Sequence, residues 1–135
     1  MSEQENVQAV QQQYATFLRG DIQAVLNGLT DDVEWQEPGP PDVLPWAGTR
    51  RGREQVAQFF TLLSEILEFE QFEPQEFIAQ GDKVVVLVRQ RVRVKTTGRT
   101  FEQDTAQVLT LREGKIAKFR IYEDTAAIVA AVRGT

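Results

Sequence analysis

The hydrophobic period of the chain changes near residue 68, and this change limits the folds that it can adopt. Up to Leu67 the apolar residues recur every three or four positions, as in amphipathic helices, whereas from Phe69 onward they alternate with polar residues, as in strands. The apolar stripes of the three predicted helices are Val7, Val10, Tyr14, Phe17 and Leu18; Ile22, Val25, Leu26 and Leu29; and Val56, Phe59, Phe60, Leu63, Ile66 and Leu67. Helices followed by a run of strands favour an α+β domain with its helices on one face of an antiparallel sheet.

Turn residues divide the second half of the chain into strands. The pairs Gly81-Asp82, Thr97-Gly98 and Glu113-Gly114 are turn signals, and they separate predicted strands at 69–80, 84–95, 100–111 and 116–122. Pro74 marks its strand as an edge strand or a bulge. The sequence therefore predicts a meander in this half.

Capping residues and breakers complete the predicted elements. Asp21 is the expected N-cap of the second helix, and Asp124 that of a last helix at 126–132. A short strand holds Val33, Trp35 and Glu37 on one face, and the prolines and glycine after it predict an irregular loop at 38–49.

Length and charge exclude several classes of protein. With 135 residues and no internal linker, the chain is expected to form one domain, 1–135. The formal net charge of −5 disfavours a nucleic acid partner, because phosphate backbones would be repelled. No apolar run approaches the 18 or more residues of a membrane span, so no membrane association and a cytoplasmic location are expected.

Cysteine and histidine are both absent. Disulfides, thiolate nucleophiles, catalytic triads with histidine and zinc sites with Cys or His ligands are thereby excluded. No glycine-rich phosphate loop is present either, so neither a metal nor a cofactor is expected. Any proton transfer would depend on a carboxyl group whose pKa is shifted, or on Tyr, Lys or Arg.

The strand at 84–95 has two unlike faces. Val84, Val86, Val88, Val92 and Val94 lie on one face, interrupted only by Gln90, and Arg89, Arg91 and Arg93 lie on the other with Val85 and Leu87. If the valine face were the one not covered by helices, it would be a large exposed apolar patch, which monomers seldom tolerate. We therefore expect a homodimer through the sheet.

The order of these elements resembles the nuclear transport factor 2-like superfamily, with a cystatin-like fold, and within it the SnoaL-like, ketosteroid-isomerase-related branch. The residues that carry the resemblance are Asp31-Asp32-Val33-Glu34-Trp35, Pro45-Trp46-Ala47-Gly48-Thr49, Gly52-Arg53-Glu54, Thr97-Gly98-Arg99, Arg112-Glu113-Gly114-Lys115-Ile116 and Phe119-Arg120-Ile121-Tyr122-Glu123-Asp124-Thr125. The resemblance implies a cone formed by a curved sheet and N-terminal helices around a pocket. It does not fix a reaction, because this superfamily holds isomerases, cyclases, dehydratases and binding modules.

The resemblance to ketosteroid isomerases suggests catalytic positions. Their general base, an acidic residue before a proline on the first strand, matches Glu37, and their oxyanion-binding tyrosine matches Tyr14. Their protonated aspartate is replaced here by Gln107, which donates a weaker hydrogen bond. The arginine of limonene-epoxide-hydrolase relatives matches Arg89, but both aspartates of that mechanism are missing, at Arg91 and Ile121, so it is not carried over.

Each candidate also has a structural interpretation. Glu37 could be a general base or a strand-end carboxylate that reaches solvent, and Arg89 an oxyanion clamp or a member of an ion pair with Glu37 or Glu123. Tyr14 and Gln107 could hold an oxyanion or belong to the core. The residues expected to bind ligand are Trp35, Trp46, Phe59, Leu63, Arg91, Phe119, Ile121 and Glu123.

The expected function is binding of a small hydrophobic carbonyl-type ligand. Isomerase, cyclase or dehydratase chemistry by a carboxylate acid or base would fit such a site, without a cofactor or metal. Two alternatives remain open at this point: a non-catalytic module that binds a small apolar molecule, and a dimeric scaffold whose pocket is filled by side chains.

Overall fold

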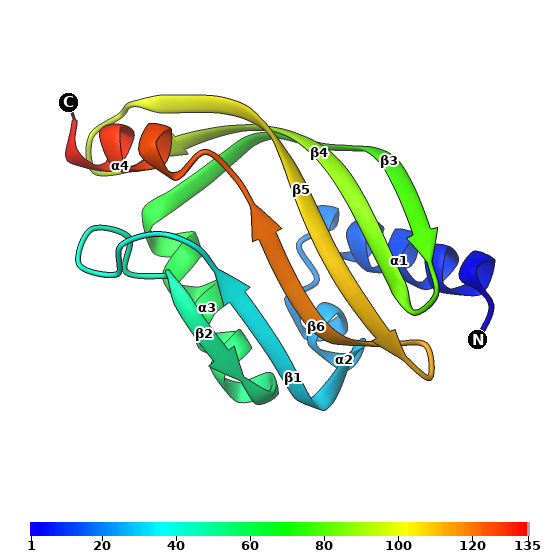
Figure 1. The fold of residues 1–135 in the computed structure, drawn as a ribbon. Coiled ribbons are helices and arrows are strands. Elements are labelled where there is room, and N and C mark those ends of the chain that lie inside the picture. The colour runs from blue at the N-terminus through cyan, green and yellow to red at the C-terminus, as the bar shows by residue number, and fades with distance from the viewer. Residues whose placement is uncertain (135) are drawn as a thin grey trace.

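The computed structural model describes residues 1–134, which form one bent six-stranded sheet and four helices (Figure 1). The elements in chain order are α1 (Glu3–Leu18), α2 (Ile22–Asn27), β1 (Leu29–Glu37), β2 (Gly48–Arg51), α3 (Gly52–Ile66), β3 (Leu67–Gln80), β4 (Lys83–Val94), β5 (Thr100–Arg112), β6 (Lys115–Tyr122) and α4 (Thr125–Arg133). The predicted α+β class is confirmed.

The strand order is β2-β1-β6-β5-β4-β3. The predicted meander is present from β3 to β6, with antiparallel neighbours throughout. The sheet is not wholly antiparallel, however, because β1 pairs with β6 in parallel. That pairing brings the end of β1 beside the end of β6, although some 85 residues of chain separate Glu37 from Glu123.

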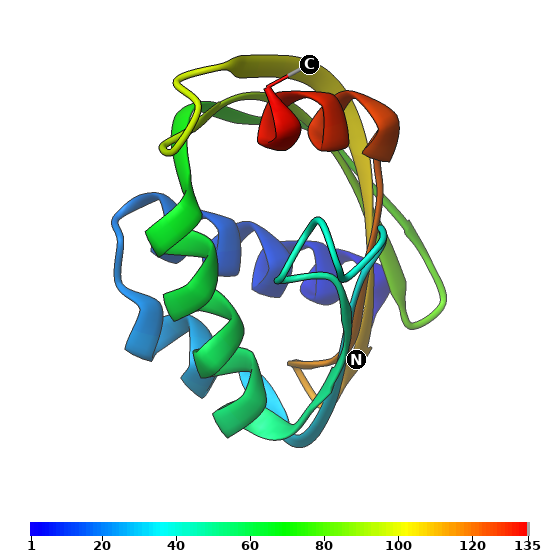
Figure 2. The same ribbon diagram turned by 90° about the vertical axis from the view of Figure 1, so that its left-hand side faces the viewer.

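The helices α1, α2 and α3 lie against the concave face of the sheet, and α4 lies across its open end (Figure 2). Pro74 lies in the edge strand β3, where the register shifts between Pro74 and Glu76, so the predicted edge or bulge is confirmed. A second shift lies between Phe69 and Gln71. Bulges bend a strand and increase its twist, which suits a sheet that curves around a cavity.

Local signals place most helix ends where they were expected. The side chain of Asp21 accepts a hydrogen bond from the backbone N–H of Ala24, and that of Asp124 accepts one from Ala127, each at 3.1 Å. At α1, Ser2 and Glu5 form a reciprocal capping box. Leu18 was assigned to the apolar stripe of α1, but it is exposed because the helix ends there. The predicted irregular loop at 38–49 also ends early, since β2 begins at Gly48.

The valine face of β4 is the inner face. Val84, Val86 and Val88 are fully buried within one copy of the chain, beneath the helices. The interpretation that this face is exposed is therefore wrong, and the homodimer expected from it loses that argument. The convex face of the sheet is the one that α1–α3 leave uncovered (Figure 2). Among the described residues, no helix has the length and apolarity needed to cross a membrane.

Candidate functional site

A cavity of about 100 Å³, counted as the space open to the centre of a water molecule, lies between the concave face of the sheet and the helices. A single water needs about 10–15 Å³ by this measure, so the cavity has room for several waters or a small organic molecule. Its lining is mostly aromatic and aliphatic. The predicted residues that line it are Tyr14, Trp35, Glu37, Trp46, Phe59, Leu63, Gln107, Phe119, Ile121 and Glu123.

Aromatic side chains form one wall of the cavity. Trp35 on β1 stacks on Phe119 of β6, with ring centroids 4.0 Å apart and planes 13° apart. The parallel pairing of β1 with β6 causes this contact, because it sets Trp35 directly beside Phe119. Phe59 and Phe60 of α3 approach Trp35 from the helical side, at 5.8 and 5.5 Å. A rigid apolar wall of this kind suits a flat hydrophobic ligand.

Glu37 is the last residue of β1 and lines the cavity. Its Oε2 accepts a hydrogen bond of 3.0 Å from the indole Nε1 of Trp35, two residues earlier on the same strand face. Burial raises the pKa of Glu37 well above its ordinary value, and the negative charge of Glu123 raises the pKa further. The hydrogen bond from Trp35 and the positive charge of Arg50 act in the opposite direction.

Glu123 follows β6 directly and also lines the cavity. Burial raises its pKa to about 7. Within residues 1–134 neither Glu37 nor Glu123 forms a salt bridge, whereas seven ion pairs join other residues. The cavity therefore holds two carboxyl groups, each with a raised pKa and neither in a salt bridge within residues 1–134.

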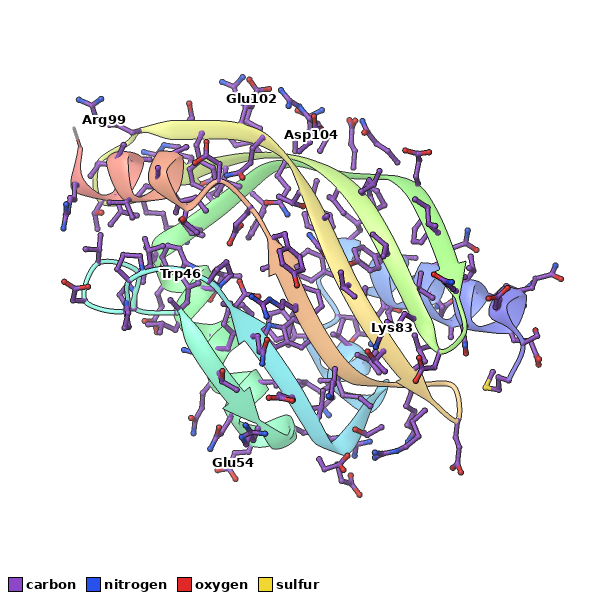
Figure 3. The ribbon with its side chains drawn as sticks, in the orientation of Figure 1. Trp46, Glu54, Lys83, Arg99, Glu102 and Asp104 are labelled. Atoms are coloured by element: carbon purple, nitrogen blue, oxygen red, sulfur yellow. The ribbon has the colours of Figure 1, made fainter. Side chains whose placement is uncertain are left out.

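Arg50 was not expected at the site, because it lies just after the predicted irregular loop at 38–49 and was assigned to no element. It lies on β2, opposite Trp35 in the β1–β2 pairing. Its Nη1 donates a hydrogen bond to the carbonyl oxygen of Trp46, and its guanidinium lies 5.2 Å from the ring centroid of Phe59. Arg50 thus joins the proline-rich loop to α3. Trp46 is 2% exposed and lies at the mouth of the bent sheet, beside β2 (Figure 3).

Tyr14 and Gln107 are hydrogen-bonded to each other. The Tyr14 hydroxyl donates to Oε1 of Gln107 at 2.5 Å, Nε2 of Gln107 donates to the Thr105 hydroxyl at 3.2 Å, and that hydroxyl donates to the carbonyl oxygen of Val88 at 3.3 Å. Burial raises the pKa of Tyr14, so the phenol stays protonated. The second N–H of the Gln107 amide remains free for a ligand.

Two buried glutamines on β4 and β5 were missed as site residues. Gln90 is 4% exposed and lines the cavity, and Gln103, its partner in the β4–β5 register, is 8% exposed. The sequence did contain a signal for Gln90, since it is the single polar residue on the valine face. Because that face was assigned to the outside, the signal was not used.

Arg89 and Arg91 do not line the cavity, so their expected positions are wrong. They lie on the convex face of β4, where Arg89 pairs with Glu102 and Asp104, each at 3.6 Å, and Arg91 pairs with Glu70 at 3.0 Å. Glu102 and Asp104 project away from the helices in Figure 3. The error has one cause: with period-two alternation, assigning the valine face to the outside moved every arginine of β4 inward.

The described part of the chain contains no group of three or more carboxylates that could hold a metal ion. The polar side chains that line the cavity end in two carboxyl groups, a phenol and several amides. Such a set can bind a polar atom of an otherwise apolar molecule and exchange protons with it.

A family model described as a SnoaL-like domain matches residues 10–119. Among solved structures, a nuclear transport factor 2-like protein from Burkholderia xenovorans LB400 is 42% identical, with 98% of each chain covered and a TM-score of 0.87. TerC, co-crystallised with polyporic acid, is 30% identical, with 96% of this chain and 98% of that chain covered and a TM-score of 0.85. A protein of unknown function with a cystatin-like fold, from Xanthomonas campestris, is 21% identical over 93% of this chain and 95% of that one, with a TM-score of 0.79.

No curated protein matches the chain. The match of the family model nevertheless covers most of the sequence, and the relatives at 30% and 42% identity cover nearly all of it. The fold, the cavity on the concave face and these matches agree. The chain belongs to the SnoaL-like family of nuclear transport factor 2-like proteins.

Proposed function

We propose that this protein is a cofactor-independent acid–base catalyst that acts on a small hydrophobic carbonyl compound. The observation that carries the proposal is the presence of two carboxyl groups, Glu37 and Glu123, in an aromatic cavity where neither forms a salt bridge with the described residues. Isomerisation, cyclisation and dehydration of such a compound all begin with removal of a proton next to a carbonyl group.

The two carboxyl groups suit this chemistry because they do not ionise together. Since the charge of Glu123 raises the pKa of Glu37, the pair retains a proton near neutral pH. The ionised carboxylate takes a proton from the carbon next to the carbonyl group, which leaves an enolate. The protonated carboxyl group returns a proton to the enolate or to a leaving oxygen, so that charge and protons balance.

Tyr14 and Gln107 have a supporting role in this proposal. Because the Tyr14 proton is donated to Gln107, the free N–H of Gln107 is the donor that this pair offers to a developing oxyanion. An amide in a cavity of this kind stabilises negative charge less than a protonated carboxyl group does. We therefore expect modest rather than high rates.

The family relationship supports a small organic ligand. TerC, at 30% identity over nearly the whole chain, was co-crystallised with polyporic acid. For the present chain, the stacked pair Trp35–Phe119 and the phenylalanines of α3 supply the apolar surface that a ring compound of modest size requires.

The test uses 2-tetralone, a compact aromatic ketone, in deuterated buffer at neutral pH. Exchange of the protons next to its carbonyl group is followed by proton NMR, with and without protein. We expect the wild type to accelerate exchange above buffer, and Glu37→Gln and Glu123→Gln each to lose about 10²–10⁴-fold of that acceleration. The matched control is Glu102→Gln on the convex face, which should exchange at the wild-type rate. Undiminished exchange in Glu37→Gln would remove Glu37 from the mechanism.

A non-catalytic binding module is the second candidate, and one observation favours it. The chain from Tyr14 through Gln107 and Thr105 to the Val88 carbonyl is already satisfied within the protein, as in a structural network. Binding of 2-tetralone by the wild type without any exchange above buffer would support this function over catalysis.

We also propose that the protein forms a homodimer through the sheet, now by its convex face. Tyr122 and Ile78 are each 51% exposed there, and Leu87 and Val108 are half-buried. Light scattering at micromolar concentration should give twice the chain mass of 15.3 kDa. Leu87→Glu should restore the monomer, and a monomeric wild type would contradict the proposal.

A further inference from the structure

The inner face of the sheet carries a buried amide whose donor has no partner. Gln103 is 8% exposed, and its Nε2 forms no hydrogen bond within the described residues. Buried amide groups are nearly always paired, so an unpaired one indicates a partner that is still to be supplied. Its position is informative, because Gln103 faces Gln90 across β4 and β5, and Gln90 lines the cavity.

The orientation of the Gln103 amide is fixed by the backbone. Its Oε1 accepts a hydrogen bond of 2.6 Å from the backbone N–H of Asp124, the N-cap residue of α4. A backbone N–H can only donate, so the oxygen of Gln103 must face it and the NH₂ group must face elsewhere. The NH₂ group of Gln103 is therefore a buried donor without an acceptor within the described residues.

Gln90, the partner of Gln103 on β4, has a side-chain oxygen that can accept a hydrogen bond from this donor. It is 4% exposed, and its side chain takes part in none of the hydrogen bonds within residues 1–134. If its Oε1 accepts from Nε2 of Gln103, its own NH₂ group is directed to the cavity. The N–H donors then point in one direction, from Asp124 through Gln103 and Gln90 to the ligand.

We propose that the Gln90 amide is a ligand subsite that donates a hydrogen bond to an uncharged oxygen acceptor, such as a ketone. Gln103 is the positioning residue that orients the Gln90 amide with its NH₂ group toward the cavity. The ligand oxygen is uncharged because Glu37 and Glu123 share the cavity and would repel a carboxylate. Gln90 and Glu123 line the same cavity, and Gln103 binds the backbone N–H of Asp124, the residue after Glu123. A ketone held at Gln90 would lie in the cavity that both carboxyl groups line.

This inference rests on the proposed function for the cavity and its ligand, and it adds where the carbonyl group binds. It does not require catalysis. A binding module with the same cavity would select the same ligands, so the test measures binding rather than turnover.

The experiment compares 2-tetralone with tetralin, which has the same rings without the oxygen. Calorimetry gives both dissociation constants, and the measured quantity is the ratio of the Kd of tetralin to that of 2-tetralone. We expect this ratio to fall about tenfold in Gln90→Leu, which keeps the side-chain size and removes the donor, as for the loss of one well-formed hydrogen bond. Gln36→Leu, on the opposite face of β1, is the control and should leave the ratio within about twofold of the wild-type value.

Two further measurements separate positioning from packing. In Gln103→Leu the ratio should fall while the Kd of tetralin stays the same, whereas a merely structural role would weaken both probes together. On the wild type, the side-chain amide signals of Gln90 in a proton–nitrogen NMR spectrum should shift more with 2-tetralone than with tetralin. That measurement does not depend on the folding of any variant.

The outcomes are distinct. An unchanged ratio in Gln90→Leu, or equal shifts of the Gln90 amide with both probes, overturns the subsite and leaves the proposed function standing. Failure of the wild type to bind either probe overturns both. Loss of the exchange reaction, with the ratio behaving as expected, removes catalysis and leaves the subsite.

Discussion

Charged side chains on the two faces of the sheet have opposite surroundings. On the convex face of the sheet, carboxylates stand beside arginines, as Arg89 does with Glu102 and Asp104. On the concave face, Glu37 and Glu123 have no such partner and are surrounded by aromatic and aliphatic side chains.

The difference indicates which charged side chains in this molecule can take part in proton transfer. Water and salt screen the charges of an exposed pair, so the pair contributes little to stability. A carboxyl group that is buried without a cation can be protonated or ionised near neutral pH, because burial raises its pKa. Reactivity is therefore expected on the face where charge is scarce, and not where it is dense.

The largest expected contrast between the faces is in packing. Leu109 and Val108 are neighbours on β5, but Leu109 is 1% exposed on the concave face and Val108 is half-buried on the convex face. Leu109→Ala should lower the free energy of unfolding by about 2–5 kcal/mol, as for a cavity left in a core. Val108→Ala should cost less than about 1 kcal/mol. Denaturant titration in the Leu87→Glu background, where the proposed dimer does not cover Val108, measures both values, and equal losses would mean that the two faces pack alike within one chain.

The sequence predicted most elements of the fold because their signals are local. The stripe of α3, the turns at Gly81 and Gly114, and the caps Asp21 and Asp124 each depend on a few neighbouring residues, and each is present. The short strand β2 was missed because its partner is β1, and nothing within Gly48–Arg51 alternates.

The face of β4 that lies inside could not be predicted in the same way. Alternation shows that Val88 and Arg89 point in opposite directions, but which one meets the helices depends on contacts distant in sequence. Burial decides it here, with Val88 fully buried. Glu123 and Gln107 were assigned to the inner face correctly because apolar residues accompany them. Gln90 was missed with the rest of its face, and Arg50 was missed because its role arises from the loop at Trp46.

The change in the free energy of unfolding with pH should have opposite signs for the buried carboxyl group of Glu123 and the surface carboxyl group of Asp32. Burial raises the pKa of Glu123 from 4.5 to about 7, so the folded state binds more protons than the unfolded state between those values. Its contribution to stability is complete below pH 4.5 and is lost as the pH rises to about 7. Since the group is only partly screened from water, we expect a loss of about 1–3 kcal/mol.

Glu123→Gln isolates this contribution. The difference in unfolding free energy between the variant and the wild type, measured by denaturant titration at several pH values, should move in favour of the variant from pH 4.5 to 7. At the surface the reverse holds: the hydrogen bond from Arg112 lowers the pKa of Asp32, so its stabilisation is present above the ordinary pKa of 3.8 and is lost as the pH falls. A flat difference for Glu123→Gln would mean that water reaches this carboxyl group freely.

The smallest effect is expected from the arginines of the convex face. The side chains of Arg89 and Arg91 are 35% and 48% exposed, and ion pairs of this kind contribute less than about 1 kcal/mol. Arg89→Gln and Arg91→Gln should therefore change the free energy of unfolding by less than that amount, and the change should shrink further at high salt. The Kd of 2-tetralone should stay at its wild-type value in both variants, because neither side chain reaches the cavity. A clear weakening of binding in Arg89→Gln would show that charge on the convex face acts through the sheet, and the separation of the two faces would fail at that strand.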